Sequence, residues 1–295
     1  MQVSHGLKIE PLCSDSMGVR SMATLVETRD LRLIIDPAAA VAPRRYGLPP
    51  HPKELEILEE YWKKIASVAK DCEVIVVTHY HYDHHSSTRF LEEIYGGRIV
   101  IVKDPENMIN FSQRIRARTF LERIKNIAAQ VVVADNKEYV FGSTSLEFSH
   151  PVPHGPDDHL GYVVELRVRD SSYSFLFTSD VQGFPLESQA RFVISKKPDV
   201  IFVDGPSTYM LGINYPIEAL EASLRNTIRI IREAFSSTII LDHHLLRDLD
   251  WRKHFKDLFE EAEKIGVDLK SAAEYVHAEI NQLEALRGLL YGLRI

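Results

Sequence analysis

The feature of this sequence that most restricts its fold is a run of metal-ligating side chains directly after a short apolar segment. Val74–Val77 is β-branched throughout and predicts a buried strand, and the next eight residues hold four histidines and one aspartate. Residues two apart in an extended chain share one side, so His79 and His81 can face one ion. Once the chain turns toward a helix, Asp83 and His84 can reach a second ion. Imidazole together with carboxylate suits zinc, iron or manganese.

Short apolar runs alternate with longer amphipathic segments along the rest of the chain. The runs predict strands at Leu31–Ile35, Val74–Val77, Arg98–Val102, Val131–Val133, Leu146–Phe148, Tyr162–Val168, Tyr173–Phe177, Val200–Val203 and Thr238–Leu241. Helical spacing of apolar side chains predicts helices at Lys53–Lys70, Thr88–Tyr95, Gln113–Ile127, Ile217–Ala234, Trp251–Ile265 and Ser271–Leu290. Val140–Ser149 and Gly161–Phe177 read as local antiparallel pairs. These patterns favour a layered mixed α/β architecture over a purely parallel sheet.

Composition narrows the class of protein. The formal net charge is −7 over 295 residues, which does not support nucleic-acid binding through bulk charge. Two cysteines, Cys13 and Cys72, make no disulfide framework and no zinc knuckle. The sequence has no signal-peptide pattern at its start and no apolar stretch long enough to span a bilayer. We therefore expect a soluble, cytoplasmic protein with no membrane contact.

Three later segments carry further candidate ligands, each after a predicted strand. His150 and His154 follow the strand in the middle of the chain, Asp180 follows the next hairpin, and His243 and His244 follow a late strand. A strand-end aspartate on its own is as often a turn or a helix cap. These candidate ligands are informative because of the order in which they follow one another along the chain.

The segment His79–His84 reads HYHYDH and resembles the HxHxDH signature of the metallo-β-lactamase superfamily, placed as in that family between a strand and a helix. The resemblance implies an α/β fold, a four-layer αββα sandwich of two mixed sheets with the metals at one edge. It extends to Asp36, whose counterpart fixes a loop near the site. The stretches Arg44–Pro52 and Asp242–Asp248 resemble a mainly archaeal group of predicted metal-dependent hydrolases in this superfamily, to which no substrate is assigned.

The same resemblance implies a set of seven ligands to two divalent metal ions. The first ion takes His79, His81 and His154, the second takes Asp83, His84 and His243, and Asp180 bridges both. His154 is preferred to His150 because a Gly-Tyr pair opens the next strand soon after it. His243 is preferred to His244, which stays open as an alternative. Zinc is the metal expected, although iron and manganese use the same kinds of ligand.

The activity implied is hydrolysis by a hydroxide bound to the dinuclear metal centre, with Asp83 also accepting a proton from the nucleophilic water. An ester, a thioester, a lactone or a phosphodiester would be cleaved. We expect one domain over 1–295, with C-terminal helices at 251–290 packing on it. The alternative is a nuclease of the same fold that uses the basic segment Arg114–Lys125 for phosphates. It is not favoured, because the stretch from Asp180 to His243 has no room for the cap domain of such nucleases.

Candidate substrate contacts are fewer. Arg44, Arg45 and Tyr46 lie in a proline-rich loop on the side where the metals are expected, and arginine pairs bidentately with phosphate or carboxylate. Salt bridges that hold the loop would explain them equally well. Tyr209 follows another strand end, where a plain turn is an equal explanation. The partner expected is a small-molecule or phosphodiester substrate, and the oligomeric state stays open.

Overall fold

The β-branched run after residue 73 lies in the first of two facing sheets. The structure is a computed structural model that describes residues 3–4 and 6–293. The first sheet has the strand order β1-β2-β3-β4-β5-β6-β7. Its strands are β1 (Val3–Ser4), β2 (Leu7–Pro11), β3 (Thr24–Glu27), β4 (Arg32–Ile35), β5 (Val74–Val77), β6 (Ile99–Val102) and β7 (Gln130–Val133). Strands β1 to β4 pair antiparallel, and β4 to β7 pair parallel.

The second sheet repeats this half-antiparallel, half-parallel plan in the order β16-β15-β14-β13-β12-β9-β8. Its strands are β8 (Glu138–Phe141), β9 (Thr144–Phe148), β12 (Leu166–Asp170), β13 (Tyr173–Phe177), β14 (Val200–Asp204), β15 (Thr238–Asp242) and β16 (Asp268–Lys270). Strands β13 to β16 pair parallel, whereas β8, β9, β12 and β13 pair antiparallel. A two-stranded hairpin, β10 (Val152–Pro153) with β11 (Tyr162–Val163), stands apart.

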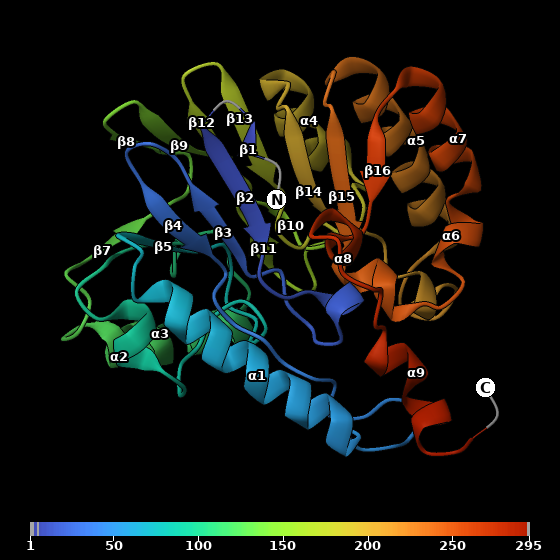
Figure 1. Ribbon diagram of the computed structural model, residues 1–295, viewed down its shortest axis with the longest axis horizontal. Coiled ribbons are helices and arrows are strands. Elements are labelled where there is room, and N and C mark those ends of the chain that lie inside the picture. The colour runs from blue at the N-terminus through green and yellow to red at the C-terminus, as the bar shows by residue number, and fades with distance from the viewer. Residues whose placement is uncertain (1–2, 5, 294–295) are drawn as a thin grey trace.

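Helices cover the outer face of each sheet (Figure 1). The first sheet is covered by α1 (Pro52–Ala69), α2 (Leu91–Tyr95) and α3 (Phe111–Ile124). The second is covered by α4 (Glu187–Lys196), α5 (Ile217–Glu233), α6 (Trp251–His254) and α7 (Lys256–Ile265). Two shorter helices, α8 (Ala272–Tyr275) and α9 (Leu283–Leu290), and three 3₁₀ turns, η1 (Asp15–Met17), η2 (Thr208–Met210) and η3 (His243–Arg247), follow the strand ends. The four-layer αββα sandwich that was predicted is confirmed.

Side-chain alternation along β5 shows how the layers are filled. Val74 and Val76 point into the apolar layer between the two sheets, where they join Phe177 and Phe202 of the second sheet. Ile75 and Val77 point the other way, toward the helices of the first sheet. A third apolar layer lies between the second sheet and its helices. Since β5 is buried on both faces, its carboxyl end, where the histidine run begins, is held firmly in place.

Several predicted elements were wrong in their extent. The helix expected at Trp251–Ile265 is split into α6 and α7, and the helix expected at Thr88–Tyr95 begins only at Leu91. The strand expected at Tyr162–Val168 is broken into β11 and β12, because the Val164 N–H leaves the ladder and donates to the Thr78 carbonyl of the first sheet (3.2 Å). The helix expected at Ser271–Leu290 is split into α8 and α9. In the segment between them, the Asn281 N–H donates to the carbonyl of Ser16 (2.7 Å), a distant partner that replaces a helical one.

The C-terminal segment is integrated with the start of the chain as well as packed on the sheets. Strand β16 extends the parallel half of the second sheet. In α8, the Ala273 N–H donates to Ser16 Oγ (2.9 Å), and in α9 the buried Arg287 binds the Glu54 carboxylate of α1 through Nε (2.8 Å) and Nη2 (2.7 Å). Helix α8 is therefore tied to η1, and the last helix is tied to the first.

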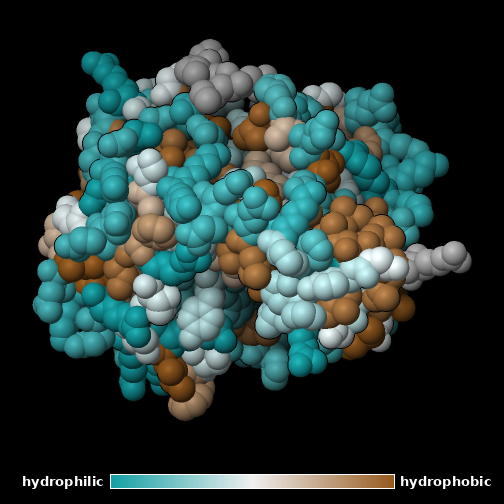
Figure 2. Space-filling model, turned by 60° about the horizontal axis from the view of Figure 1, so that its bottom comes forward, coloured by the Kyte–Doolittle hydropathy of each residue, from teal (hydrophilic) through white to brown (hydrophobic). Residues whose placement is uncertain are grey.

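No helix among the described residues is both long enough and apolar enough to cross a membrane. The face drawn in Figure 2 is mostly hydrophilic, and its hydrophobic residues form separate patches. The content of charged residues, 26% of the chain, is ordinary for a globular protein.

Candidate metal centre

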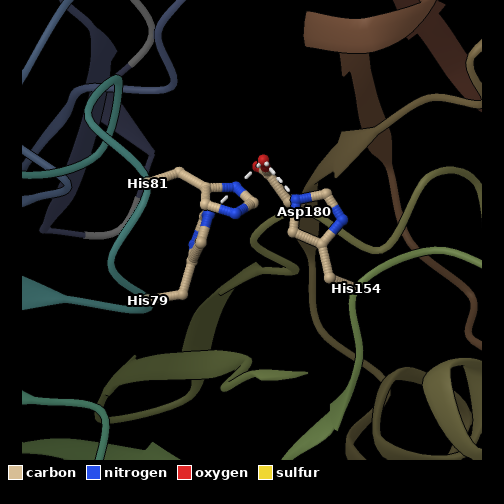
Figure 3. A group of neighbouring side chains, drawn as sticks. All are labelled: His79, His81, His154 and Asp180. Atoms are coloured by element: carbon tan, nitrogen blue, oxygen red, sulfur yellow. Dashed lines mark hydrogen bonds and ion pairs between the residues drawn. The ribbon is translucent and has the colours of Figure 1, made fainter. Parts of the chain in front are cut away.

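The candidate ligands are brought together by strand ends of both sheets. His79 and His81 follow β5 in the first sheet, and Asp180 and His243 follow β13 and β15 in the second. His154 comes from the loop after β10. Figure 3 shows His79 and His81 approaching from one side and His154 and Asp180 from the other, with the imidazole rings converging on the carboxylate. The site thus lies between the two sheets, at the edge where their strands end.

Asp180 occupies the centre of the cluster. Its Oδ1 lies 3.1 Å from His84 Nε2, and its Oδ2 lies 3.1 Å from His154 Nε2. The same Oδ2 lies 3.6 Å from His79 Nε2 and 3.5 Å from His243 Nε2. One carboxylate therefore contacts imidazoles of both predicted ligand sets, which is the position that a bridging ligand requires.

The candidate ligand atoms of the described residues form four overlapping groups, in each of which they lie within 4.8 Å of one another, and two of these groups contain the predicted ligand sets. The first group is His79, His81, His154 and Asp180. The second is Asp83, His84 and His243, with His243 Nε2 3.8 Å from Asp83 Oδ2. The structure thus brings together all seven predicted ligands, in the two sets that the resemblance implied.

Carboxylates behind the ligands fix the ring orientations on the second group. The His84 Nδ1–H donates to Asp36 Oδ2 (2.8 Å), and the His243 Nδ1–H donates to Asp15 Oδ2 (2.7 Å). Each bond turns the opposite ring nitrogen, Nε2, toward the cluster. Such carboxylate–imidazole pairs are the usual support of a histidine ligand in metal sites. Asp36 also accepts from the Thr78 N–H (2.8 Å), so the expected loop-fixing role of Asp36 has a direct structural basis.

Hydroxyl groups support the first group in a similar way. His79 Nδ1 lies 3.2 Å from Ser179 Oγ and 3.3 Å from Thr78 Oγ1, which bond to each other at 2.6 Å. Ser179 and His243 both have positive φ, +57° and +58°. For residues other than glycine this conformation is strained, and it is retained here where the chain turns from a strand end into the ligand cluster.

The donors present fit a pair of divalent cations. Among the described residues, His79 Nε2 is buried without a hydrogen-bond partner, and the buried His84 Nε2 and Asp180 Oδ1 have only each other, 3.1 Å apart. Leaving buried polar atoms unpaired is costly, so their convergence calls for a bound cation. Removal from water lowers the pKa of His81 to about 3 in the metal-free protein, which keeps its ring in the neutral form that binds metals.

The carboxylate of the second group is ionised before any ion binds, beside two imidazoles whose pKa values the charge of Asp180 raises despite their burial. Burial alone would raise the pKa of Asp83, but the neighbouring His84 and His243 outweigh burial and lower that pKa. Asp83 is therefore ionised at neutral pH. An ionised carboxylate among imidazoles is the donor set that zinc, iron and manganese share.

The structure favours His243 over His244 as the last ligand. His243 belongs to the group with Asp83 and His84 and has its ring held by Asp15. His244 instead bonds through Nδ1 to Asp204 Oδ1 (2.9 Å), although its other nitrogen also comes near Asp180. His150, the alternative to His154, is exposed and does not line the site.

Two adjoining cavities open beside the cluster. A cavity of about 390 Å³ is bordered by His81, Asp83, His154 and Asp180 of the metal centre. The next, of about 530 Å³, shares Arg20, His154, Leu160, His244 and Arg247 with it and is also bordered by Tyr209. The position of Tyr209 is thus compatible with substrate contact.

The three other predicted substrate contacts do not border either cavity. Arg44 is exposed. The Arg45 guanidinium lies between the rings of Tyr46 and Tyr209, 4.7 Å and 4.5 Å from their centres, and donates to the Arg247 carbonyl (3.0 Å). Tyr46 OH donates to the Ala285 carbonyl (3.1 Å). Arg45 and Tyr46 hold a loop, which was the other explanation of these residues, so the structure does not support the three as substrate contacts.

Three arginines lie on the cavities of the site instead: Arg20 and Arg247, which the sequence did not single out, and Arg116 of the basic segment Arg114–Lys125. Arg247 is buried and donates through Nε to Asp15 (2.8 Å) while its Nη2 lies 3.2 Å from His243 Nε2. Arg20 is held by Glu284 through two bonds, 2.6 Å and 2.7 Å. Arg116 lies over the exposed ring of Tyr82, 4.8 Å from its centre. The sequence signal that could have pointed to Arg247 is its position in the stretch Asp242–Asp248, which also contains His243.

Comparison with known proteins agrees with the fold and the site. Residues 17–181 match the Metallo-beta-lactamase superfamily. A UPF0282 protein of Korarchaeum cryptofilum is 50% identical over 287 residues, which cover 97% of this chain and 95% of the relative. A UPF0282 protein of Metallosphaera sedula is 46% identical over 287 residues, which cover 97% and 93%.

Among solved structures, the metallo-beta-lactamase fold protein YhfI from Bacillus subtilis is similar with a TM-score of 0.51 and 13% identity, over 91% of this chain and 96% of that one. An isothiocyanate hydrolase from Delia radicum gut bacteria is similar with a TM-score of 0.51 and 16% identity, over 85% and 92%. At these identities the likeness concerns the fold alone.

Proposed function

The chain belongs to the metallo-β-lactamase superfamily and, within it, to the archaeal UPF0282 group, and from this premise we propose that it is a hydrolase with two divalent cations at its active site. The observation that carries the proposal is the position of Asp180, whose two oxygens contact imidazoles of both ligand groups. Zinc is the metal we propose, with iron or manganese compatible with the same donors.

The residues proposed to hold the cations are the two groups described above. His79, His81 and His154 would hold one ion, Asp83, His84 and His243 the other, and Asp180 both. When bound, such ions supply an activated water at neutral pH and stabilise negative charge that develops on the substrate. Asp83 borders the cavity and its side chain is 17% exposed, so it can take the proton of the attacking water.

His244 contributes a fixed ring in the cavity wall. Its Nδ1 is bonded to the buried Asp204, which also accepts from the His244 backbone N–H (3.1 Å). Two bonds from one carboxylate hold both the backbone and the ring. We propose that the opposite edge of the ring contacts the substrate and orients it toward the metal centre, because precise orientation lowers the barrier of a hydrolytic step.

The charges around the cavity favour an anionic substrate. Arg20, Arg116 and Arg247 border the cavity beside the ligands. Arg20 and Arg247 are already paired with carboxylates, but Arg116 lies within ion-pair distance of none in the described part of the chain. A guanidinium with free donors at a cavity mouth recognises phosphate or carboxylate oxygens. We therefore favour a phosphodiester or a carboxylate-bearing ester of a small molecule over a neutral lactone or thioester.

The basic helix that suggested a nuclease is largely committed to partners of its own. Arg114 and Arg118 lie near the Glu106 carboxylate, at 3.8 Å and 3.5 Å, and Arg123 donates to the Ser87 carbonyl (2.6 Å). Lys125 pairs with Glu122. Only Arg116 of this helix borders the cavity beside the ligands. A helix that binds the phosphates of a polynucleotide would have more of these basic side chains free of other partners.

The proposal is tested by metal analysis together with hydrolysis assays. We expect about two equivalents of transition metal per chain after reconstitution, and hydrolysis of bis-(p-nitrophenyl) phosphate faster than of p-nitrophenyl acetate. His81→Ala should lose metal and lower the rate by about 100-fold or more. The matched control is His150→Ala, which removes an exposed imidazole remote from the cluster and should leave both unchanged.

Less than one equivalent of metal in the reconstituted protein would contradict the proposal. Full activity of the His81→Ala variant would also contradict it, because this ring is the member of the first group that borders the cavity most openly. Faster turnover of the neutral ester would keep the hydrolase and remove the preference for an anion.

A further inference from the structure

A second cavity of about 600 Å³ lies away from the metal centre, between α4 and the strand ends of the second sheet. It shares no bordering residue with the two cavities beside the metal ligands. Apolar side chains of Phe148, Val152 and Phe192 form part of its wall. Its position on the helix-covered face of the sheet separates it from the reaction described above.

The residue that distinguishes this cavity is Glu165, between β11 and β12. Its neighbours Val164 and Leu166 belong to the apolar layer between the two sheets. Because side chains alternate along an extended chain, Glu165 points to the opposite face, where α4 and the cavity lie. A carboxyl group is therefore directed at the cavity from a backbone that is fixed on both sides.

The carboxyl group of Glu165 lacks a partner. The residue is 0% exposed, and neither of its carboxyl oxygens has a hydrogen-bond partner among the described residues. Its backbone is satisfied, since the N–H donates to Ser149 Oγ (2.9 Å) and the carbonyl accepts from the Ser149 N–H (3.0 Å). Burial of an unpaired carboxyl group is costly, and a fold keeps such a group where a ligand or ordered water completes it.

The other carboxylate of the cavity is already neutralised. Glu147 pairs with Lys196 and lies 3.6 Å from Arg167. Glu165 is therefore the carboxyl group of the cavity that forms no ion pair among the described residues. Burial raises the pKa of Glu165 and so favours its protonated form in the empty cavity, whereas a positive charge placed beside it would stabilise the ionised form. The apolar wall suits a hydrocarbon or aromatic body attached to that charge.

We propose that this cavity binds a small organic cation, in which a protonated amine or amidine donates N–H groups to Glu165 and an apolar body packs on Phe148 and Phe192. The site is independent of hydrolysis at the metal centre. Two connections lead to that centre: the bordering residues Val152 and Pro153 directly precede His154, and the Val164 N–H donates to the carbonyl of Thr78 beside the first ligand (3.2 Å).

The proposal is tested by calorimetric titration of the full chain with benzamidine and with phenethylamine, and with phenethyl alcohol as the neutral probe. We expect saturable binding of the two cations with Kd at or below about 1 mM, and binding of the alcohol at least about tenfold weaker. Glu165→Gln should weaken cation binding by at least about tenfold. The matched control, Glu218→Gln, changes an exposed carboxylate that does not border this cavity and should leave binding within about twofold.

A readout of folding accompanies each variant. Metal content and hydrolysis of bis-(p-nitrophenyl) phosphate should equal those of the wild type in Glu165→Gln, so that lost binding is not a lost fold. If that variant does not fold, Glu165→Leu, which fills the space without a polar group, takes its place. Equal binding of cations by the variant and the wild type, or no saturable binding of either cation by the wild type, overturns the proposal.

Discussion

Asp15 and His243 lie 228 positions apart in the sequence, and their side chains are joined by a 2.7 Å hydrogen bond at the edge of the metal centre. Asp15 also accepts from Arg247 Nε (2.8 Å), so that one buried carboxylate positions both an imidazole and a guanidinium. Asp15 should therefore affect how tightly the ion held by His243 is bound. Replacing Asp15 by Asn leaves His243 without a charged support.

We expect Asp15→Asn to weaken binding of one of the two ions by about 10- to 100-fold while the other is retained. Competition with a chelator of known affinity measures the affinity for each ion. The variant should release its two ions in two separate transitions, where the wild type releases them in one. The substitution Asp36→Asn acts on His84 in the same group and should give a similar loss. Unchanged affinity in both variants would mean that His84 and His243 do not bind metal.

The roles of His243 and His244 can be separated by their single alanine variants. His243→Ala should lose about one equivalent of metal, because it removes a ligand of the second group. His244→Ala should keep both equivalents and lower kcat by about 10- to 100-fold, because its ring is bonded to Asp204 and borders the substrate cavity. Metal loss in His244→Ala with full retention in His243→Ala would reverse the assignment of the last ligand.

Arg116 should set the preference for negative charge. Arg116→Ala is expected to raise KM for an anionic ester by about tenfold and to leave KM for a neutral ester unchanged, because the guanidinium is free of ion pairs and lies at the cavity. The effect should shrink at high salt. Arg118→Ala is the matched control, since Arg118 is on the same helix but lies near Glu106 and borders neither cavity of the site. Equal effects of the two variants would show that only the general charge of the helix matters.

The pair formed by Arg20 and Glu284 predicts a pH-dependent stability. Burial alone would raise the pKa of Glu284, but the bonds and charge of Arg20 outweigh it and lower the pKa to about 2. An acid whose pKa is depressed by folding stabilises the protein above its unfolded pKa of about 4.3, and this contribution disappears as the pH falls through the folded value. Glu284→Gln should therefore lower the free energy of unfolding by about 2 to 3 kcal/mol at pH 7.

Urea denaturation of the metal-free wild type and Glu284→Gln checks this at pH 7, 5 and 3. The difference between the two proteins should be constant from pH 7 to about pH 5 and clearly smaller at pH 3. A difference that does not change with pH would mean that the carboxylate charge contributes nothing and that the variant only disturbs packing.

The candidate metal ligands were predictable because most of their segments directly follow a short apolar strand. The bounds of Val74–Val77 are confirmed, and parallel strands that end at one edge place their following residues together. Asp15 had no such signal. It lies in a short 3₁₀ turn after β2, and only the folded chain brings it to His243. Arg20 was hidden for the same reason, since it depends on Glu284 in the last helix.

The fold was predictable where periodicity was long or strongly apolar. Strand β2 was not predicted, although its sequence alternates as a strand does. Leu7 and Ile9 are buried, and Lys8 between them is only partly buried. The split of the last predicted helix was not readable, since its apolar spacing continues through residues 276–282. Long-range bonds such as Asn281 N–H to the Ser16 carbonyl decide the backbone there, and local pattern carries no information about them.

The bond between Asp15 and His243 also bears on how the protein is made. The ribosome synthesises the chain from the N-terminus. All residues of the first ligand group are therefore present once Asp180 has been added. The second group is complete only after His243 has been added. The carboxylate that pairs with Arg20, that of Glu284, is added later still. In the proposed two-ion site, the second ion can therefore be fully coordinated only after His243 has been added, and a nascent chain stalled before His243 holds an incomplete site.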